Sequence, residues 1–194
     1  MDHAELTTAL LAERRAFYAR ARGGAALPAA GALYWGVLAA IGWAFPTMHI
    51  PIWNIIAFAG SGLIFPLGLL LQAPLRSSIT EKSPLGGLVA PGLAAMGLSW
   101  AVTLPLFVSQ PEMVPLALAV GMSLHWPVIG WMYGRMAPFL IHAAARAVAC
   151  MAIWFVFPAQ VTTLLPASVC AIYLATVVFI LIDATAERRR LGMA

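Results

Sequence analysis

The chain has 194 residues, of which 62% are hydrophobic and only 9% are charged, and its mean hydropathy is +0.91. A soluble domain carries roughly 25% charged residues, and a soluble core of this size cannot bury so much apolar surface, so lipid is the expected solvent. The net charge of +4 does not indicate nucleic-acid binding, because the basic residues are spread over short segments between apolar runs.

The first 23 residues combine helical periodicity with many charges. Apolar positions such as Leu6, Leu10 and Phe17 recur at three- and four-residue steps among glutamates and arginines. We predict an amphipathic helix over residues 1–23 that lies at the cytoplasmic membrane surface and leads into the first span. A partly ordered tail is the alternative. A cleaved signal peptide is not expected, because the charged stretch is long and many spans follow it.

Six apolar segments follow, each close to the ~20 residues that a helix needs to cross the hydrocarbon. They cover approximately residues 27–44, 51–71, 87–108, 113–133, 139–157 and 162–182. Short connections rich in proline and glycine separate them, as expected where helices end. The predicted fold class is therefore all-α, a polytopic membrane protein. A bundle of six transmembrane helices fills residues 24–184, and residues 185–194 form a basic cytoplasmic tail.

The basic residues outside the spans indicate the orientation of the bundle. They all fall before span 1, between spans 2 and 3, between spans 4 and 5, or after span 6; they are Arg14, Arg15, Arg20, Arg22, Arg76, Lys82, Arg135, Arg188, Arg189 and Arg190. The other three connections contain no lysine or arginine. The positive-inside rule therefore predicts that both termini lie in the cytoplasm.

One charge falls inside a span, Arg146 in segment 139–157. Charges inside a membrane are costly and indicate a functional site by default. At 1.5 Å per residue, Arg146 lies roughly 10 Å inside the cytoplasmic boundary and His125 of the preceding span lies at a similar depth. His142 shares a helical face with Arg146. No span carries a carboxylate, so Arg146 is predicted to meet an anionic ligand, or else to snorkel or bond only within the protein.

Aromatic and proline residues fall at the same depth. Tyr34, Trp35 and Trp126 are predicted to form aromatic walls around a cytoplasm-facing pocket. Pro66 and Pro127 each follow an aromatic residue inside a span, where a proline removes a backbone donor and clashes with the preceding turn. We therefore predict structural kinks at these two prolines. Kinks without any special role are equally compatible with the pattern, since prolines are common in membrane helices.

Three strings resemble a known family. The predicted span 51–71 contains Gly-Ser-Gly-Leu-Ile-Phe-Pro-Leu-Gly at residues 60–68, the next loop contains Lys-Ser-Pro-Leu-Gly at 82–86, and the predicted span 113–133 contains Leu-His-Trp-Pro-Val-Ile-Gly-Trp-Met-Tyr at 124–133. Together with Tyr34 and Trp35, they resemble a family of small bacterial multi-span proteins, the domain of unknown function number seven-zero-one-zero. The resemblance runs from about residue 17 onward, implies a bacterial inner-membrane protein and implies no activity.

The leading functional hypothesis is a non-enzymatic protein that binds a small amphipathic or anionic ligand, such as a membrane lipid. The sequence does not decide whether the protein also transports that ligand. Arg146 would supply the charge, and His125 would orient the ligand with help from His142. Two alternatives remain: an intramembrane enzyme acting on a lipid or isoprenoid, with a histidine as acid or base, and a structural or assembly protein without a ligand. We predict no catalytic residue for the leading hypothesis, no metal, no cofactor and no nucleic-acid partner. The oligomeric state stays open.

Overall fold

The computed structural model describes residues 2–193, and within that range every regular element is a helix. The predicted all-α class is therefore confirmed. Residues 2–193 form ten α-helices joined by short loops and 3-10 turns: α1 (His3–Ala21), α2 (Ala26–Ala44), α3 (Ile50–Ser61), α4 (Ile64–Leu75), α5 (Val89–Leu98), α6 (Trp100–Ser109), α7 (Val114–Gly121), α8 (Trp126–Met132), α9 (Met136–Val156) and α10 (Val161–Arg190).

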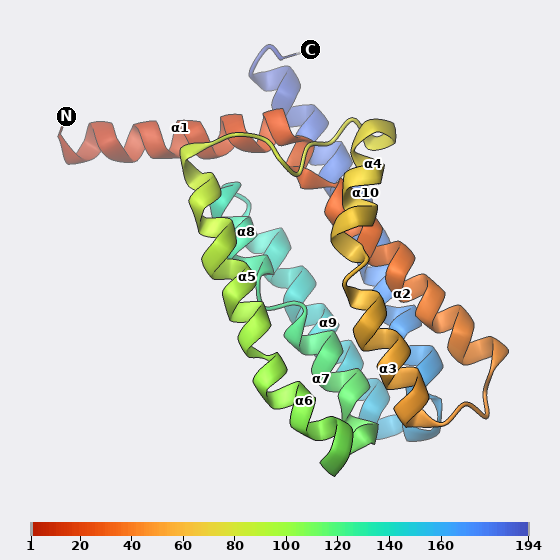
Figure 1. The fold of residues 1–194 in the computed structure, drawn as a ribbon. Helices are drawn as coiled ribbons and strands as arrows, with labels where there is room; N and C mark the ends of the chain where they lie inside the picture. Colours follow the sequence, from red (N-terminus) through yellow and green to blue (C-terminus); the bar gives the residue numbers. More distant parts are fainter. Residues whose placement is uncertain (1, 194) are drawn as a thin grey trace.

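Helix α1 lies across one end of the bundle (Figure 1). It begins with a capping box, in which the Asp2 carboxylate accepts from the Glu5 N–H and the Glu5 carboxylate accepts from the Asp2 N–H. It ends where Arg22, Gly23 and Gly24 take positive φ angles of 47°, 65° and 62°. These left-handed residues turn the chain sharply into α2, and glycine tolerates such angles without steric cost.

Most of the predicted spans correspond to helical segments that are long and apolar enough to cross a membrane. In the described part of the chain, five helical segments qualify by length and composition: His3–Ala44, Pro84–Ser109, Pro111–Met132, Met136–Val156 and Pro158–Arg190. A sixth results when α3 and α4, which meet at a bend of 51°, are counted together. The all-α fold therefore contains five or six candidate spans among residues 2–193, which is compatible with a membrane protein. Its last helix continues to Arg190, so the basic residues of segment 185–194 form the final turns of α10.

The two aromatic–proline pairs start new helices. Phe65 and Pro66 lie in the first turn of α4, and Trp126 and Pro127 open α8. The missing N–H of proline costs nothing in a first turn, where backbone donors have no partner within the helix. The chain is thus interrupted just before each proline, between α3 and α4 and between α7 and α8, instead of bending within one continuous helix.

A third interruption, at Ser99 between α5 and α6, has no proline close by and was not predicted. It shares a feature with the other two. Ser61, Ser99 and Ser123 each lie at a break, and each hydroxyl donates to the carbonyl three residues earlier at 2.6 Å. Serine hydroxyls compete with the helical hydrogen bonds in this way. Three consecutive apolar segments are therefore broken, and at each break a serine hydroxyl bonds one nearby carbonyl.

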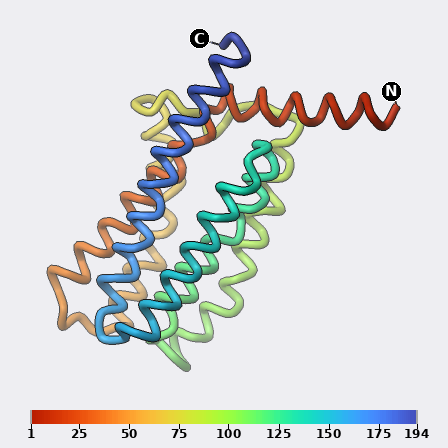
Figure 2. Tube along the Cα trace, turned by 180° about the vertical axis from the view of Figure 1, so that it is seen from behind, coloured from red at the N-terminus to blue at the C-terminus, as the bar shows by residue number. Residues whose placement is uncertain are grey.

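The helices form two groups, α2, α3, α4 and α10 on one side and α5 to α9 on the other (Figure 1). Helix α10 packs along α2, where a side chain at Gly42 would collide with the Thr162 carbonyl. It also packs on α9, which runs beside it when the molecule is seen from behind (Figure 2). The two helices therefore join the groups, and both chain ends lie at the same end of the bundle.

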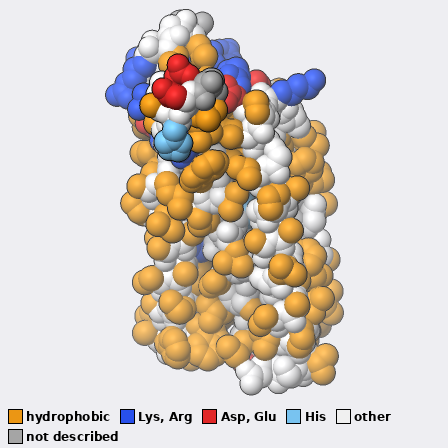
Figure 3. Space-filling view, turned by 90° about the vertical axis from the view of Figure 1, so that its left-hand side faces the viewer, with side chains coloured by type: hydrophobic (Ala, Val, Ile, Leu, Met, Phe, Trp, Pro, Cys, Tyr) orange, Lys and Arg blue, Asp and Glu red, His pale blue; other side chains and the backbone are white. Residues whose placement is uncertain are grey.

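Charged side chains gather at that end, while apolar side chains cover the shaft (Figure 3). Arg135, in the turn between α8 and α9, pairs with Asp183 at 2.6 Å and Glu187 at 2.9 Å, and its guanidinium lies 4.8 Å from the Tyr18 ring centre. Burial lowers the pKa of Arg135, but hydrogen bonds and charges from Asp183 and Glu187 outweigh it and hold that pKa above its ordinary value. This cluster ties α1, α10 and the α8–α9 turn together.

Candidate functional site

Arg146 lies in the middle of α9 and is completely buried, with 0% of its surface exposed. Its Nη1 donates to the Tyr173 hydroxyl at 2.9 Å. Its guanidinium carbon lies 5.0 Å from the ring centre of Trp35 and 5.2 Å from that of Tyr173, within the range of cation–π attraction. A fully buried guanidinium between two aromatic rings does not reach an interface, which argues against the snorkelling alternative.

The charge of Arg146 has no compensating carboxylate among residues 2–193. Its Nε and Nη2 donors also lack a hydrogen-bond partner in that part of the chain. Native proteins leave few buried polar groups unpaired, and each such group calls for a water, an ion or a ligand. An uncompensated buried charge is the most costly case of this kind.

His142 lies one turn from Arg146 and is also buried. Its Nδ1 lies 2.7 Å from the Thr176 hydroxyl, which itself donates to the Ile172 carbonyl at 2.8 Å. Because the threonine has a single proton, this arrangement is satisfied when Nδ1 of His142 is the donor. The imidazole stacks 4.2 Å from Trp126, centre to centre. Its Nε2 is left as an acceptor without a partner in the described residues.

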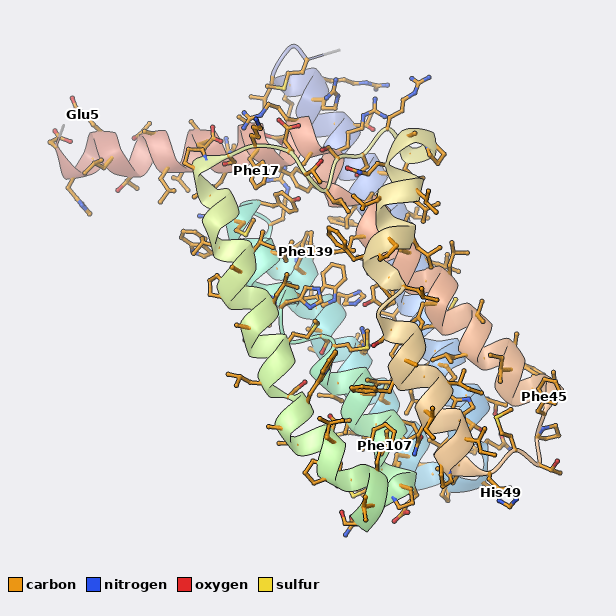
Figure 4. The ribbon with its side chains drawn as sticks, in the orientation of Figure 1. Glu5, Phe17, Phe45, His49, Phe107 and Phe139 are labelled. Atoms are coloured by element: carbon orange, nitrogen blue, oxygen red, sulfur yellow. The ribbon has the colours of Figure 1, made fainter. Side chains whose placement is uncertain are left out.

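Two neighbouring cavities, each of about 240 Å³, lie between the two groups of helices. They share five lining residues, Leu27, Phe65, Leu93, His125 and Trp126. In Figure 4 the side chain of Phe139, which lines the first of these cavities, is seen between α5 and α4. The shared residues make the two cavities one hollow that runs along the inner sides of α4 and α5.

The cavities differ in depth. The shallower one reaches the charged end of the bundle, where Phe17, Thr80 and Glu81 line it. The deeper one reaches the break after Ser61 and ends against Tyr173. Both are lined mostly by apolar side chains, and in the part of the chain that the structure describes neither is lined by a lysine or arginine.

The predicted site residues separate into two sets. His125 and Trp126 line both cavities. Arg146, His142 and Trp35 lie behind the cavity wall, in the buried polar cluster around Tyr173. The structure therefore places the predicted charge close to the hollow but not in direct contact with it.

Tyr34 lies outside the lining of both cavities. Its hydroxyl donates to the Ala57 carbonyl at 2.6 Å and so bonds α2 to α3. Tyr173, which was not among the predicted site residues, belongs to both the deeper cavity and the buried cluster. The available signal was a tyrosine deep within the last apolar segment, but neither periodicity nor depth indicates that it faces α9.

The model of a family of unknown function, DUF7010, matches residues 10–183. The chain belongs to the DUF7010 family. This membership confirms the resemblance seen in the three sequence strings, and it assigns no activity. No curated protein and no solved structure matches the chain. The matched range of this DUF7010 protein contains both cavities and the whole buried cluster, so the candidate site lies within the family's shared region.

Proposed function

We propose that this DUF7010 protein is a six-span protein of a bacterial inner membrane and that the hollow between α4 and α5 binds a membrane amphiphile. The observation that carries the proposal is the pair of adjoining apolar cavities that meet at His125 and Trp126. Ligand sites are typically concave, mostly apolar and supplied with a few polar groups that orient the ligand. The hollow has this composition.

Six spans follow when α3 and α4 are taken as one broken span. Irregular backbone is tolerated at membrane depth where it is buried in protein or lines a cavity, and Gly62 at the break lines the deeper cavity. An even number of spans puts both termini at the end that carries the basic residues, which the positive-inside rule assigns to the cytoplasm. Helix α1, with Leu6, Leu10 and Leu11 exposed, would then lie on the cytoplasmic face of the membrane.

Single-cysteine labelling tests this topology. A membrane-impermeant maleimide should label His49→Cys in cells whose outer membrane has been made permeable. It should label Arg189→Cys only after the inner membrane is opened as well. Both positions lie outside the apolar parts of the helices, so their access depends on the side of the membrane alone. Labelling of Arg189→Cys with the inner membrane intact would contradict the orientation.

The hollow is positioned for entry from the lipid. Helix α4 packs mainly on α2, whereas α5 packs on α6 and α8, so the seam between α4 and α5 is the loosely packed side of the bundle. Leu93 of α5 lines both cavities and is 47% exposed, which places it at the opening. An acyl or isoprenoid chain in the membrane can reach the cavities through this seam.

The arrangement favours binding over acid–base catalysis. A catalytic histidine needs a partner within hydrogen-bond reach and access to the substrate. His142 has Thr176 as a partner but does not line the hollow. His125 lines it but makes no hydrogen bond of ordinary geometry to the described residues. In the described chain, neither histidine has both a hydrogen-bond partner and access to the hollow, so ligand binding explains the site better than acid–base catalysis does.

Filling the hollow should abolish binding. Leu93→Trp places a bulky indole at the junction of the two cavities, which removes most of a small site. The probes are a fatty alcohol and a fatty acid that each carry a diazirine. We expect their photolabelling of the lining residues to fall at least about tenfold. Labelled positions are identified by mass spectrometry of peptides from membranes irradiated with the probes.

Leu98→Trp is the matched control. Leu98 lies on the same helix, is 73% exposed and lines neither cavity. Labelling of the cavity residues should be unchanged in this variant. Uniform labelling of the whole lipid-facing surface, insensitive to Leu93→Trp, would show that the hollow binds no amphiphile.

A further inference from the structure

We propose that the hollow selects an amphiphile with an anionic oxygen head group, a carboxylate or a phosphate monoester, and that Tyr173 couples this head group to the buried charge of Arg146. The inference rests on the proposed function and names the ligand class of that site. It assigns a binding role to Tyr173, and it makes Arg146 a positioning residue that acts through the tyrosine.

Tyr173 is the residue that the hollow and the buried cluster share. Its ring lines the deeper cavity, and its hydroxyl oxygen accepts a hydrogen bond from Nη1 of Arg146. A tyrosine hydroxyl is also a donor, and the described residues offer no acceptor for this proton. Because the cation polarises the O–H bond, the hydroxyl is a strong donor toward an oxygen that enters the cavity.

Besides Tyr173, four polar side chains line the deeper cavity: Ser61, Trp100, His125 and Trp126. The Ser61 hydroxyl already donates to the Phe58 carbonyl, and a neutral His125 can both donate and accept. The two tryptophans offer donors alone. The indole of Trp126 lines the deeper cavity, and its Nε1 has no acceptor in the described part of the chain. An indole N–H can only donate. A head group rich in acceptors, such as a carboxylate or phosphate, therefore matches the wall better than an ammonium group, which can only donate.

The net charge around the hollow favours the same class. Glu81 is the one carboxylate that lines either cavity in the described chain, and Arg20 pairs with it at 3.3 Å. Arg146 is left as the uncompensated charge next to the deeper cavity. At an effective dielectric constant of about 20 and a separation on the order of 6 Å, its attraction for an anion corresponds to roughly a hundredfold in affinity.

The position of the tyrosine ring depends on Gly31 of α2. A Cβ at this position would lie 2.8 Å from Cζ of Tyr173 and 2.9 Å from one of its ring carbons. An alanine here must therefore displace the ring and its hydroxyl. Gly36, on the same helix, would meet only Cys170 Sγ at 3.3 Å and tolerates the same substitution more easily.

The test measures quenching of tryptophan fluorescence by brominated single-chain amphiphiles in neutral detergent. Dibromostearate, the corresponding phosphate monoester, the alcohol and the phosphocholine share one chain and differ in head group. For the wild type we expect the two anionic probes to bind at least about tenfold more tightly than the alcohol, and the phosphocholine to bind no better than the alcohol. We expect inorganic phosphate not to compete with the anionic probes, because binding requires the acyl chain of the probe. Competition by inorganic phosphate would show that the site binds free anions instead.

Four variants assign the effect. Tyr173→Phe and Gly31→Ala should each reduce the anion-to-alcohol ratio to near one while alcohol binding persists, and Gly36→Ala should retain the ratio. Arg146→Met should also lower it, because the source of the field is removed. Equal binding of all head groups by the wild type, with Leu93→Trp still blocking them, would overturn the inference and leave the proposed function standing. Quenching by none of the probes would overturn both.

Discussion

Arg146→Met is expected to make the unliganded protein more stable than the wild type. The substitution removes a charge that is completely buried and has no carboxylate partner among residues 2–193. It also loses the bond to Tyr173 and the contact with Trp35, which offset part of the gain. We expect a net increase of about 1–3 kcal/mol in the free energy of unfolding.

Thermal and denaturant unfolding in neutral detergent, followed by circular dichroism, measure this change. Arg189→Met is the matched control, because Arg189 is exposed in the last turn of α10 and its loss should change stability by less than about 0.5 kcal/mol. A loss of stability in Arg146→Met would show that the guanidinium is compensated, for example by ordered water. A higher free energy of unfolding in Arg146→Met would show that Arg146 destabilises the unliganded protein, as expected for a residue of a binding site.

Arg135→Met is expected to have the opposite and larger effect. Arg135 is the shared partner of Asp183 and Glu187, and the Glu187 side chain is only 6% exposed. Removing the cation leaves two neighbouring carboxylates, one of them nearly buried, and the exposed Arg190, 3.5 Å from Glu187, is the cation that still pairs with them among residues 2–193. After discounting for the partial exposure of Arg135, we expect the free energy of unfolding to fall by about 2–4 kcal/mol.

A second substitution separates charge from packing. Adding Glu187→Gln to Arg135→Met removes the most buried of the stranded carboxylates, so part of the lost stability should return. The same unfolding measurements apply, with Arg189→Met again as the control. If the double variant is no more stable than Arg135→Met, lost packing against Tyr18 would explain the effect instead of the stranded charge.

The positions of the helices were predictable from the sequence to a large extent. Each predicted apolar segment corresponds to one helix or one broken pair, for example 139–157 to α9. Hydropathy and helix-ending prolines are local properties, and they act in the same way whatever the neighbours are. The break at Ser99 was missed, because no proline lies in the helical turn that follows it, whereas the other two breaks are followed by Pro66 and Pro127.

The site was predictable only in part. Depth along the helices assigned His125, His142, Arg146 and Trp126 to one layer of two consecutive helices, and in the structure the ring centres of His142 and Trp126 are 4.2 Å apart. Depth does not determine the direction in which a side chain points. His125 faces the hollow and Arg146 lies behind its wall, although the two were assigned similar depths.

The sequence by itself determined that this chain is all-α, with apolar helices long enough to span a membrane and with charges gathered at one end, because the solvation of each residue depends on its own chemistry. It also indicated membership of the DUF7010 family. Only the tertiary structure decided that α10 brings Tyr173 to Arg146, and that α4 and α5 leave a hollow between them. Those features depend on how each helix is rotated about its axis, which packing against several neighbours sets together.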